Sequence, residues 1–266
     1  MLRPQRNLDR SHFHGEIPSM KSPLHAVRAC LIALCLFTVG AHATVVVGST
    51  RVVFPAQDGE VTVRLSNEGD RPALIEAWMD RGNPHSTPDK VDVPFLITPP
   101  LFRMEAHKEQ SLRIIATPAP MPSDRESLFW LNVLEIPPKP TSAEIQGKNL
   151  LQFAIRSRLK FFYRPTQLSG DVLKAPEQVT WKIVPDGQGY ALEAHNPTPY
   201  HITFTRLSLN VAGKQYIANT DMVDPFSTLR LPVKGLTQAA PAGTPVAYDI
   251  INDYGAQNSF KGAVTP

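Results

Sequence analysis

The fold is decided by the stretch LLQFAIRSRLKFFYRP, residues 150–165. Apolar side chains recur at every second position through Leu151, Phe153 and Ile155. This is the period of a β-strand, and the same stretch carries the basic residues Arg156, Arg158, Lys160 and Arg164. The pattern predicts one long strand. The pattern fits a half-buried central strand whose charged face is exposed to solvent. It also fits an edge strand that presents alternate apolar side chains to a partner.

Several other segments share this two-residue period. They are residues 61–65, 112–116 and 179–183. Turn sequences such as Asn-Glu-Gly-Asp at 67–70 and Pro-Asp-Gly at 185–187 separate the segments. The chain of 266 residues also holds 26 prolines, about twice the usual share, and prolines break helices. No long helical period occurs, so the sequence predicts an all-β chain of sandwiches or barrels.

The chain divides naturally at Arg164-Pro165, where a predicted strand ends and the polar stretch 166–170 begins. This boundary predicts one domain over residues 44–165 and a second over residues 166–266. Each has the usual size of a β-sandwich.

The first 43 residues have the features of a secretory signal peptide. An apolar run over residues 29–39 follows basic residues and precedes Ala41-His42-Ala43, a small-residue cleavage site. The run is shorter than the roughly 20 apolar residues that span a bilayer, so no membrane span is predicted. We expect cleavage after Ala43 and export to the periplasm, and Met20 is an alternative start of translation.

The signal peptide accounts for two properties of the whole chain. Both cysteines, Cys30 and Cys35, lie within it, so the mature chain forms no disulfide. Its five basic and two acidic side chains give it a net charge of +3, which is also the net charge of the full sequence. The mature chain is therefore nearly neutral. The basic isoelectric point therefore does not indicate a nucleic-acid partner.

The mature chain shows no pattern typical of an active site. Its histidines, at positions 85, 107, 195 and 201, have no metal-ligand spacing and are expected in loops. It contains no nucleophile elbow, no cysteine nucleophile and no glycine-rich phosphate loop. Carboxylates such as Asp249 and Asp253 are too common to indicate a glycosidase pair. The sequence predicts no enzyme, no metal and no cofactor.

Residues 121–137, MPSDRESLFWLNVLEIP, resemble the signature of the periplasmic pilus chaperones, the PapD-like family. Three further blocks resemble the family in its own order: LKFFYRP at 159–165, NPTPYHITF at 196–204 and INDYG at 251–255. The resemblance therefore covers nearly all of the mature chain. Only about a dozen residues separate the signature from Leu150, which resembles the short-loop members.

The resemblance implies two immunoglobulin-like β-sandwiches set at an angle, with a cleft between them. It also implies a non-enzymatic chaperone that binds, folds and caps pilus subunits in the periplasm. A pilus subunit is an incomplete sandwich, and the chaperone lends it the missing strand by donor-strand complementation. An outer-membrane usher then receives the subunit, and no cofactor is involved.

The resemblance also implies roles for single residues. Arg51 and Lys160 match the two cleft residues that bind the C-terminal carboxylate of the subunit. Leu151, Phe153 and Ile155 match the alternating side chains of the donated strand, which fill pockets of the subunit groove.

Three further matches, Glu126, Arg164 and Asp253, correspond to an interdomain charge network. The network is expected to hold the angle between the sandwiches, and with it the shape of the cleft.

Two other functions are alternatives to the chaperone. One is a secreted two-sandwich adhesin or carbohydrate-binding module, which would use surface aromatics such as Trp78 or Tyr200. The other is a secreted hydrolase, for which no motif is present. The sequence leaves open which pilus subunit is bound, and whether the free protein caps its strand by forming a homodimer.

Overall fold

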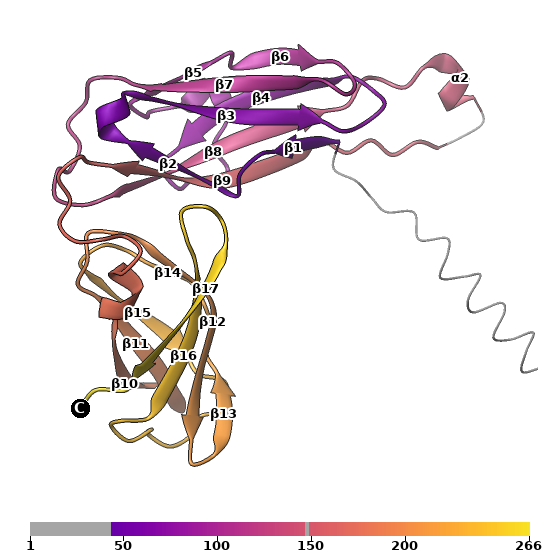
Figure 1. The fold of residues 1–266 in the computed structure, drawn as a ribbon. Coiled ribbons are helices and arrows are strands. Elements are labelled where there is room, and N and C mark those ends of the chain that lie inside the picture. The colour runs from indigo at the N-terminus through magenta and orange to yellow at the C-terminus, as the bar shows by residue number, and fades with distance from the viewer. Residues whose placement is uncertain (1–43, 147–148) are drawn as a thin grey trace, which may run out of the picture. The chain divides into compact units, whose positions relative to one another are not determined.

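The protein is described by a computed structural model over residues 44–146 and 149–266 (Figure 1). Strands dominate the described chain, so the prediction of an all-β protein is confirmed. The predicted signal peptide, its cleavage after Ala43 and the alternative start at Met20 all lie outside the described residues. The described residues from Thr44 to Pro266 belong to one compact unit.

Two sheets form the first sandwich. One sheet has the strand order β1-β3-β7-β5, and the other has the order β2-β9-β8-β4-β6. Their bounds are β1 Val45–Val47, β2 Arg51–Pro55, β3 Glu60–Asn67, β4 Ala73–Asp80, β5 Phe95–Thr98, β6 Leu101–Met104, β7 Glu109–Ala116, β8 Ser127–Ile136 and β9 Ile155–Arg164. Short helices α2 (Ser142–Ile145), η1 (Ala56–Asp58) and η2 (Pro88–Lys90) lie in the connections.

The inner faces of these sheets meet in an aromatic core. Phe54, Phe129 and Phe161 are at most 1% exposed, and Phe95 is 8% exposed. The ring of Phe95 meets Phe161 edge-on with centroids 4.9 Å apart, and it meets Phe129 at 5.0 Å. Edge-to-face contacts of this kind add to the gain from burial. The alternation that predicted strands thus also places one side chain in two inside the sandwich.

A second pair of sheets follows in the chain. One has the order β10-β11-β15, the other has the order β13-β12-β16-β17, and β14 adds to β12. Their bounds are β10 Thr180–Asp186, β11 Gly189–Asn196, β12 Ile202–Val211, β13 Lys214–Ile217, β14 Met222–Val223, β15 Ser227–Pro232, β16 Pro245–Ile251 and β17 Gln257–Ala263. The short helix η3, Ala175–Gln178, precedes them.

The second sandwich has a separate core. Trp181 and Tyr248 are each 1% exposed, and their ring centroids lie 5.0 Å apart. The Tyr248 hydroxyl donates to the Pro176 carbonyl at 2.8 Å, and burial together with the negative charge of Glu177 raises its pKa to about 12. The tyrosine therefore stays neutral in its buried site. The predicted division after residue 165 stays a prediction.

Strand β9 is paired unequally along its length. It runs antiparallel to β8 from Ile155 to Tyr163, but the parallel strand β2 accompanies it only from Lys160 onward. The N-terminal half of β9 therefore has one hydrogen-bonded neighbour. Among the described strands its other edge has no partner there, so the backbone groups on that edge are available for pairing.

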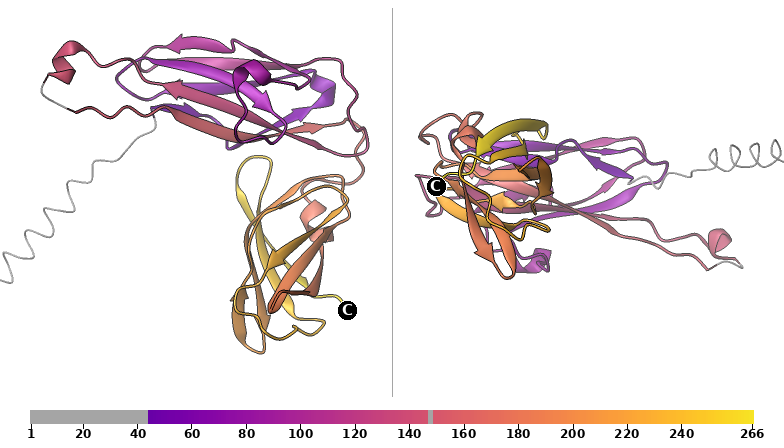
Figure 2. Two further views of the ribbon diagram at one scale, coloured as in Figure 1. Left: turned by 180° about the vertical axis from the view of Figure 1, so that it is seen from behind. Right: turned by 90° about the horizontal axis from the view of Figure 1, so that it is seen from below.

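The expectation of a strand starting at Leu150 was wrong. The strand begins at Ile155, which pairs with Glu135 near the end of β8. Pro137 and Pro138 follow β8, and because proline has no N–H, the ladder cannot continue along them. Residues 149–154 consequently pair with none of the described strands. Both views in Figure 2 show α2, in the same connection, well away from the strands.

We expect Phe161→Ala to lower the free energy of unfolding of the first sandwich by about 3–5 kcal/mol, because the ring is completely buried. Urea denaturation followed through indole NMR signals measures this, since Trp78 and Trp130 lie in the first sandwich and Trp181 in the second. Tyr254→Ala is the control, because Tyr254 is 89% exposed and should change stability by less than about 0.5 kcal/mol. Equal losses in the two variants would contradict this core.

Candidate functional site

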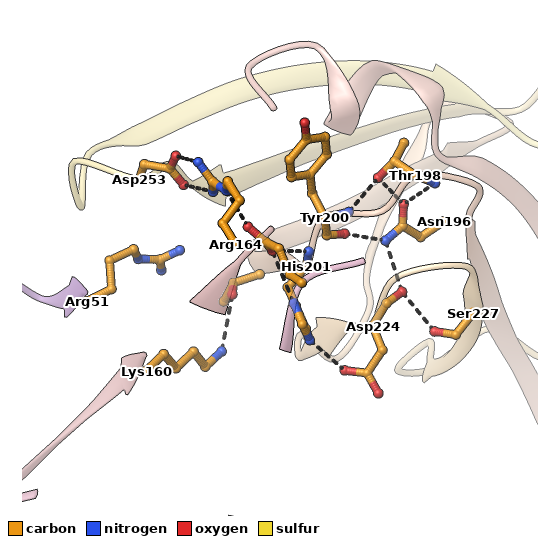
Figure 3. A network of polar contacts seen from close by, with 12 residues as sticks. Arg51, Lys160, Arg164, Asn196, Thr198, Tyr200, His201, Asp224, Ser227 and Asp253 are labelled. Atoms are coloured by element: carbon orange, nitrogen blue, oxygen red, sulfur yellow. Dashed lines mark hydrogen bonds and ion pairs between the residues drawn. The ribbon is translucent and has the colours of Figure 1, made fainter. Parts of the chain in front are cut away.

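Arg51 and Lys160 lie side by side on parallel strands. Arg51 begins β2, Lys160 lies in the middle of β9, and the two residues are direct partners in the strand register. Their side chains extend in the same direction, as Figure 3 shows. A parallel pair brings two positive charges to one place, although 109 positions separate them in the chain.

The charges of this pair are not neutralised by direct contacts. Arg51 donates one hydrogen bond to the Ile251 carbonyl at 2.9 Å, and Lys160 donates one to Thr203 Oγ1 at 3.1 Å. Neither forms an ion pair with a described carboxylate, and Arg51 Nε is buried without a partner in the described chain. Two half-buried cations in this state favour an anion between or beside them.

Burial also affects the protonation of both groups. It lowers the pKa of Arg51, although the charges of Asp253 and Glu126 oppose the effect. Burial and, secondarily, the neighbouring charge of Arg51 lower the pKa of Lys160. Both shifts reflect cations that have lost water without gaining a full counter-charge, and a bound carboxylate would reverse them.

Arg164 is the centre of a compensated network. Its Nε donates to Glu126 at 2.7 Å, and its two terminal nitrogens donate to the Asp253 carboxylate at 2.7 and 3.0 Å (Figure 3). Burial alone would lower the pKa of Arg164, but the bonds and charges of Asp253 and Glu126 raise it well above its ordinary value. This network joins the strand end of the first sandwich to the β16–β17 turn of the second.

His201 is a member of this network that sequence reasoning missed. Its backbone N–H donates to Glu126 Oε2 at 2.8 Å, and its ring Nδ1 lies 3.1 Å from the same oxygen. The residue lies just before β12, outside the strands as the sequence predicted, but its side chain is only 5% exposed. The position follows Pro199-Tyr200 in the NPTPYHITF block, but no local pattern links it to a glutamate 75 residues earlier.

A cavity of about 160 Å³ adjoins Arg51 and the Arg164 network. Arg51, Arg164 and Asp253 line its polar part, and residues such as Val172 and Phe260 line its apolar part. Arg51, which forms no ion pair with a described carboxylate, therefore faces this cavity.

The turn between β16 and β17 closely approaches the residue before β2. Gly255 has a φ of +80°, and a methyl group added there would collide with the Thr50 side chain. Only glycine meets both conditions without strain. The close approach places the turn that carries Asp253 directly beside Arg51.

Nearly all of the described chain matches two sequence models of one family. Residues 44–169 match the pili and flagellar-assembly chaperone PapD N-terminal domain, and residues 174–261 match the pili assembly chaperone PapD C-terminal domain. The chain belongs to the PapD-like pilus assembly chaperones. This confirms the predicted family and the two-sandwich fold of these chaperones, and it confirms that the protein is not an enzyme.

Similar proteins carry the same description. The Bordetella pertussis chaperone protein FimB/FhaD is 44% identical over 228 residues, which is 84% of this chain and 89% of that protein. The crystal structure of the Pseudomonas aeruginosa CupB2 chaperone is 38% identical with a TM-score of 0.69, over 82% of this chain and all of that one. The Salmonella enterica SafB chaperone, solved in complex with the SafA pilin, is 28% identical with a TM-score of 0.69, over 85% of this chain and 99% of that one.

The three side chains expected on the donated strand are exposed in this chaperone. Leu151, Phe153 and Ile155 are 77%, 67% and 41% exposed. Exposure of large apolar side chains to water is unfavourable. Three of them in one short segment indicate a surface that binds another molecule. They lie in the segment that enters the half-open part of β9.

Two aromatic residues expected at the surface of a carbohydrate-binding module lie inside the chaperone instead. Trp78 in β4 is 5% exposed and stacks under the Arg156 guanidinium, whose carbon is 4.7 Å from the ring centroid. Tyr200 is 6% exposed, and its hydroxyl donates to the Gly170 carbonyl at 3.2 Å. Neither ring is available to stack on a sugar, so that alternative loses the residues it required.

The described residues hold no other obvious chemistry. They contain no group of three metal-ligating side chains, and none of their helices is long and apolar enough to cross a membrane. The carboxylates of Asp249 and Asp253 belong to separate ion pairs, with Arg206 at 2.7 Å and with Arg164.

We expect Arg164→Met to lower the free energy of unfolding by about 3–5 kcal/mol, because the buried carboxylate of Glu126 would lose its counter-charge. Urea denaturation at neutral pH measures the change. Arg113→Met is the control, since its ion pair with Glu60 is exposed and such pairs contribute less than about 1 kcal/mol. A loss in Arg164→Met no larger than in the control would show that the network is not stabilising.

Proposed function

We propose that this chaperone caps a pilus subunit by lending it the segment from Leu151 to Ile155 as a strand. The segment is exposed, apolar at alternate positions and continuous with a strand whose next residues have an open edge. Two uncompensated cations lie further along the same strand pair. An exposed apolar segment leading to a cationic end is the observation that carries the proposal.

The lent side chains supply the apolar part of the interaction. Once the segment is extended as a strand continuous with β9, they would share the face on which Leu159 and Phe161 fill the sandwich core, because side chains two apart in a strand point the same way. Full burial of each in a subunit groove would contribute about 1.5–3 kcal/mol. The open edge of β9 supplies hydrogen bonds to the subunit backbone, as in other strand-addition complexes.

Arg51 and Lys160 supply the anchor. A C-terminal carboxylate between them would accept charge-assisted hydrogen bonds worth about 1.5–3 kcal/mol each when partly desolvated. The anchor also selects the register of the two strands. A slip of one residue would turn Leu151 and Phe153 away from the groove.

The network of Glu126, Arg164 and Asp253 has a structural role in this proposal. It ties residues of the two sandwiches together through bonds of 2.7–3.0 Å, and so it keeps Arg51 and Lys160 at a constant place in the site. Its members are fully paired with one another and are not expected to contact the subunit.

Capping of the subunit takes place in the periplasm in this proposal. A signal peptide over residues 1–43 would deliver the chaperone there, and an outer-membrane usher would receive the capped subunit as the next subunit replaces the lent strand. Before a subunit is bound, the exposed segment is an aggregation hazard. A homodimer that covers Leu151 and Phe153 is the self-capped form included in the proposal.

Binding of the subunit tests the anchor and the strand separately. The mature chain is co-expressed in the periplasm with a pilin-like subunit encoded beside it, and the soluble one-to-one complex is measured by size exclusion. We expect Arg51→Ala and Lys160→Ala to abolish most of the complex, because each leaves the carboxylate half-paired. Lys182→Ala, an exposed lysine on β10, is the matched control and should bind normally.

The strand is tested in the same assay with Leu151→Ala and Phe153→Ala. Each should weaken the complex by about tenfold or more, because a buried apolar side chain is lost. Leu96→Ala is the matched control, since Leu96 is 55% exposed on β5. Complexes that survive all four site substitutions would overturn the proposed mode of binding.

A further inference from the structure

A buried carboxylate lies on the outer face of the β4–β8–β9 sheet. Asp80, at the end of β4, is 5% exposed. It accepts hydrogen bonds from Gly82 N at 2.6 Å, Ser86 Oγ at 3.1 Å, Asn132 Nδ2 at 2.8 Å and Arg158 at 2.6 Å. Burial alone would raise the pKa of Asp80, but the bonds from Arg158 and Asn132 keep it below its ordinary value. Asp80 is therefore a fixed negative charge.

Arg156 is held against this carboxylate by an unusual number of contacts. Its Nε and one terminal nitrogen donate to Asn132 Oδ1 at 2.9 and 2.6 Å, and the other donates to the Pro84 carbonyl at 2.8 Å. It also bonds Ser86 Oγ at 3.2 Å and stacks on Trp78. The planar guanidinium is thus fixed on both its edge and its face, which a lysine could not reproduce.

These residues form one unit across three strands. Arg156 lies 3.8 Å from the Asp80 carboxylate, and the Arg158 guanidinium carbon lies 4.1 Å from the centroid of the Trp130 ring. We name Asp80, Asn132, Arg156 and Arg158 the Asp80 cluster. Nothing in the proposed anchor or in the Arg164 network uses it.

The cluster lies at the root of the exposed segment. Arg156 directly follows Ile155, where β9 begins, and its side chain points to the opposite face from Ile155. At Arg156 the backbone of β9 is paired only with β8 among the described strands, so fewer backbone hydrogen bonds hold the strand there than after Lys160. Beyond it, Gln152 Nε2 donates to the Pro138 carbonyl at 2.7 Å, which ties the segment to the residues that follow β8.

We propose that Arg156 is a positioning residue that fixes the direction in which the exposed segment leaves the sandwich. The inference rests on the proposed function, because it assumes that this segment is lent to a subunit. Fixing the root before binding reduces the conformational entropy that must be lost when the strand pairs. The side chain acts from the face opposite the lent residues, so it need not touch the subunit.

The dissociation constant of the subunit complex tests the inference in the mature protein. We expect Arg156→Ala to raise it about tenfold, because the root of the segment must then be ordered when the subunit binds. Arg156→Lys should raise the dissociation constant by an intermediate factor. The positive charge remains, but the planar set of guanidinium donors is lost. Arg64→Ala, whose side chain is 72% exposed on β3, is the matched control and should not change it. Thermal unfolding confirms that each variant is folded, and Arg156→Lys carries the test if Arg156→Ala is not.

A double-mutant cycle with Phe153→Ala separates positioning from general stability. Phe153 is 67% exposed in the segment before β9, whereas Arg156 packs against Trp78 and Asn132, so their effects on binding should be independent unless one positions the other. A positioning role predicts that Arg156→Ala raises the constant by less than about threefold in the Phe153→Ala background. The same tenfold effect in both backgrounds would overturn the inference.

The two proposals fail in different ways. If Phe153→Ala and Lys160→Ala both bind as the unchanged protein does, the proposed function itself is wrong. If those two variants lose affinity while Arg156→Ala behaves like Arg64→Ala, only the positioning role is wrong.

Discussion

The unequal pairing of β9 is the constraint on which the rest of the structure depends. Strand β8 accompanies it from Ile155 onward, while β2 reaches it only at Lys160. The doubly paired half fills the core with Phe161 and holds Arg164 in its network. The singly paired half keeps one backbone edge free and continues into exposed apolar residues. One strand therefore provides both a rigid base and an unfinished edge.

The same strand separates two kinds of charge. Arg164 is matched by Glu126 and Asp253, so it stabilises the fold and has no capacity left for a ligand. Lys160 and its neighbour Arg51 are half-buried without a matching carboxylate in the described chain. A cation that has lost water without gaining a partner binds an anion more strongly than one in solvent does. The difference between the two groups lies in their partners rather than in their residue types.

Local patterns in the sequence predicted the strands, because alternation reports directly on which face is buried, as for Phe161 and Trp181. They did not predict where pairing ends. The start of β9 depends on Pro137 and Pro138 ending its neighbour, not on residues 150–154 themselves. The contact of His201 with Glu126 and the cluster around Asp80 join residues far apart in the chain, and no local pattern encodes them. The roles of Arg51 and Lys160 came from family resemblance, and the structure adds that the two are register partners.

Hydrogen–deuterium exchange over residues 149–159, measured in the free chaperone and in its complex with a subunit, tests the central claim most directly. The segment before Ile155 has no strand partner in the described chain, so its amides should exchange rapidly in the free protein. We predict that alternate amides of this segment become strongly protected in the complex, as a new strand pair requires. A stable complex in which these amides still exchange at the free rate would contradict it.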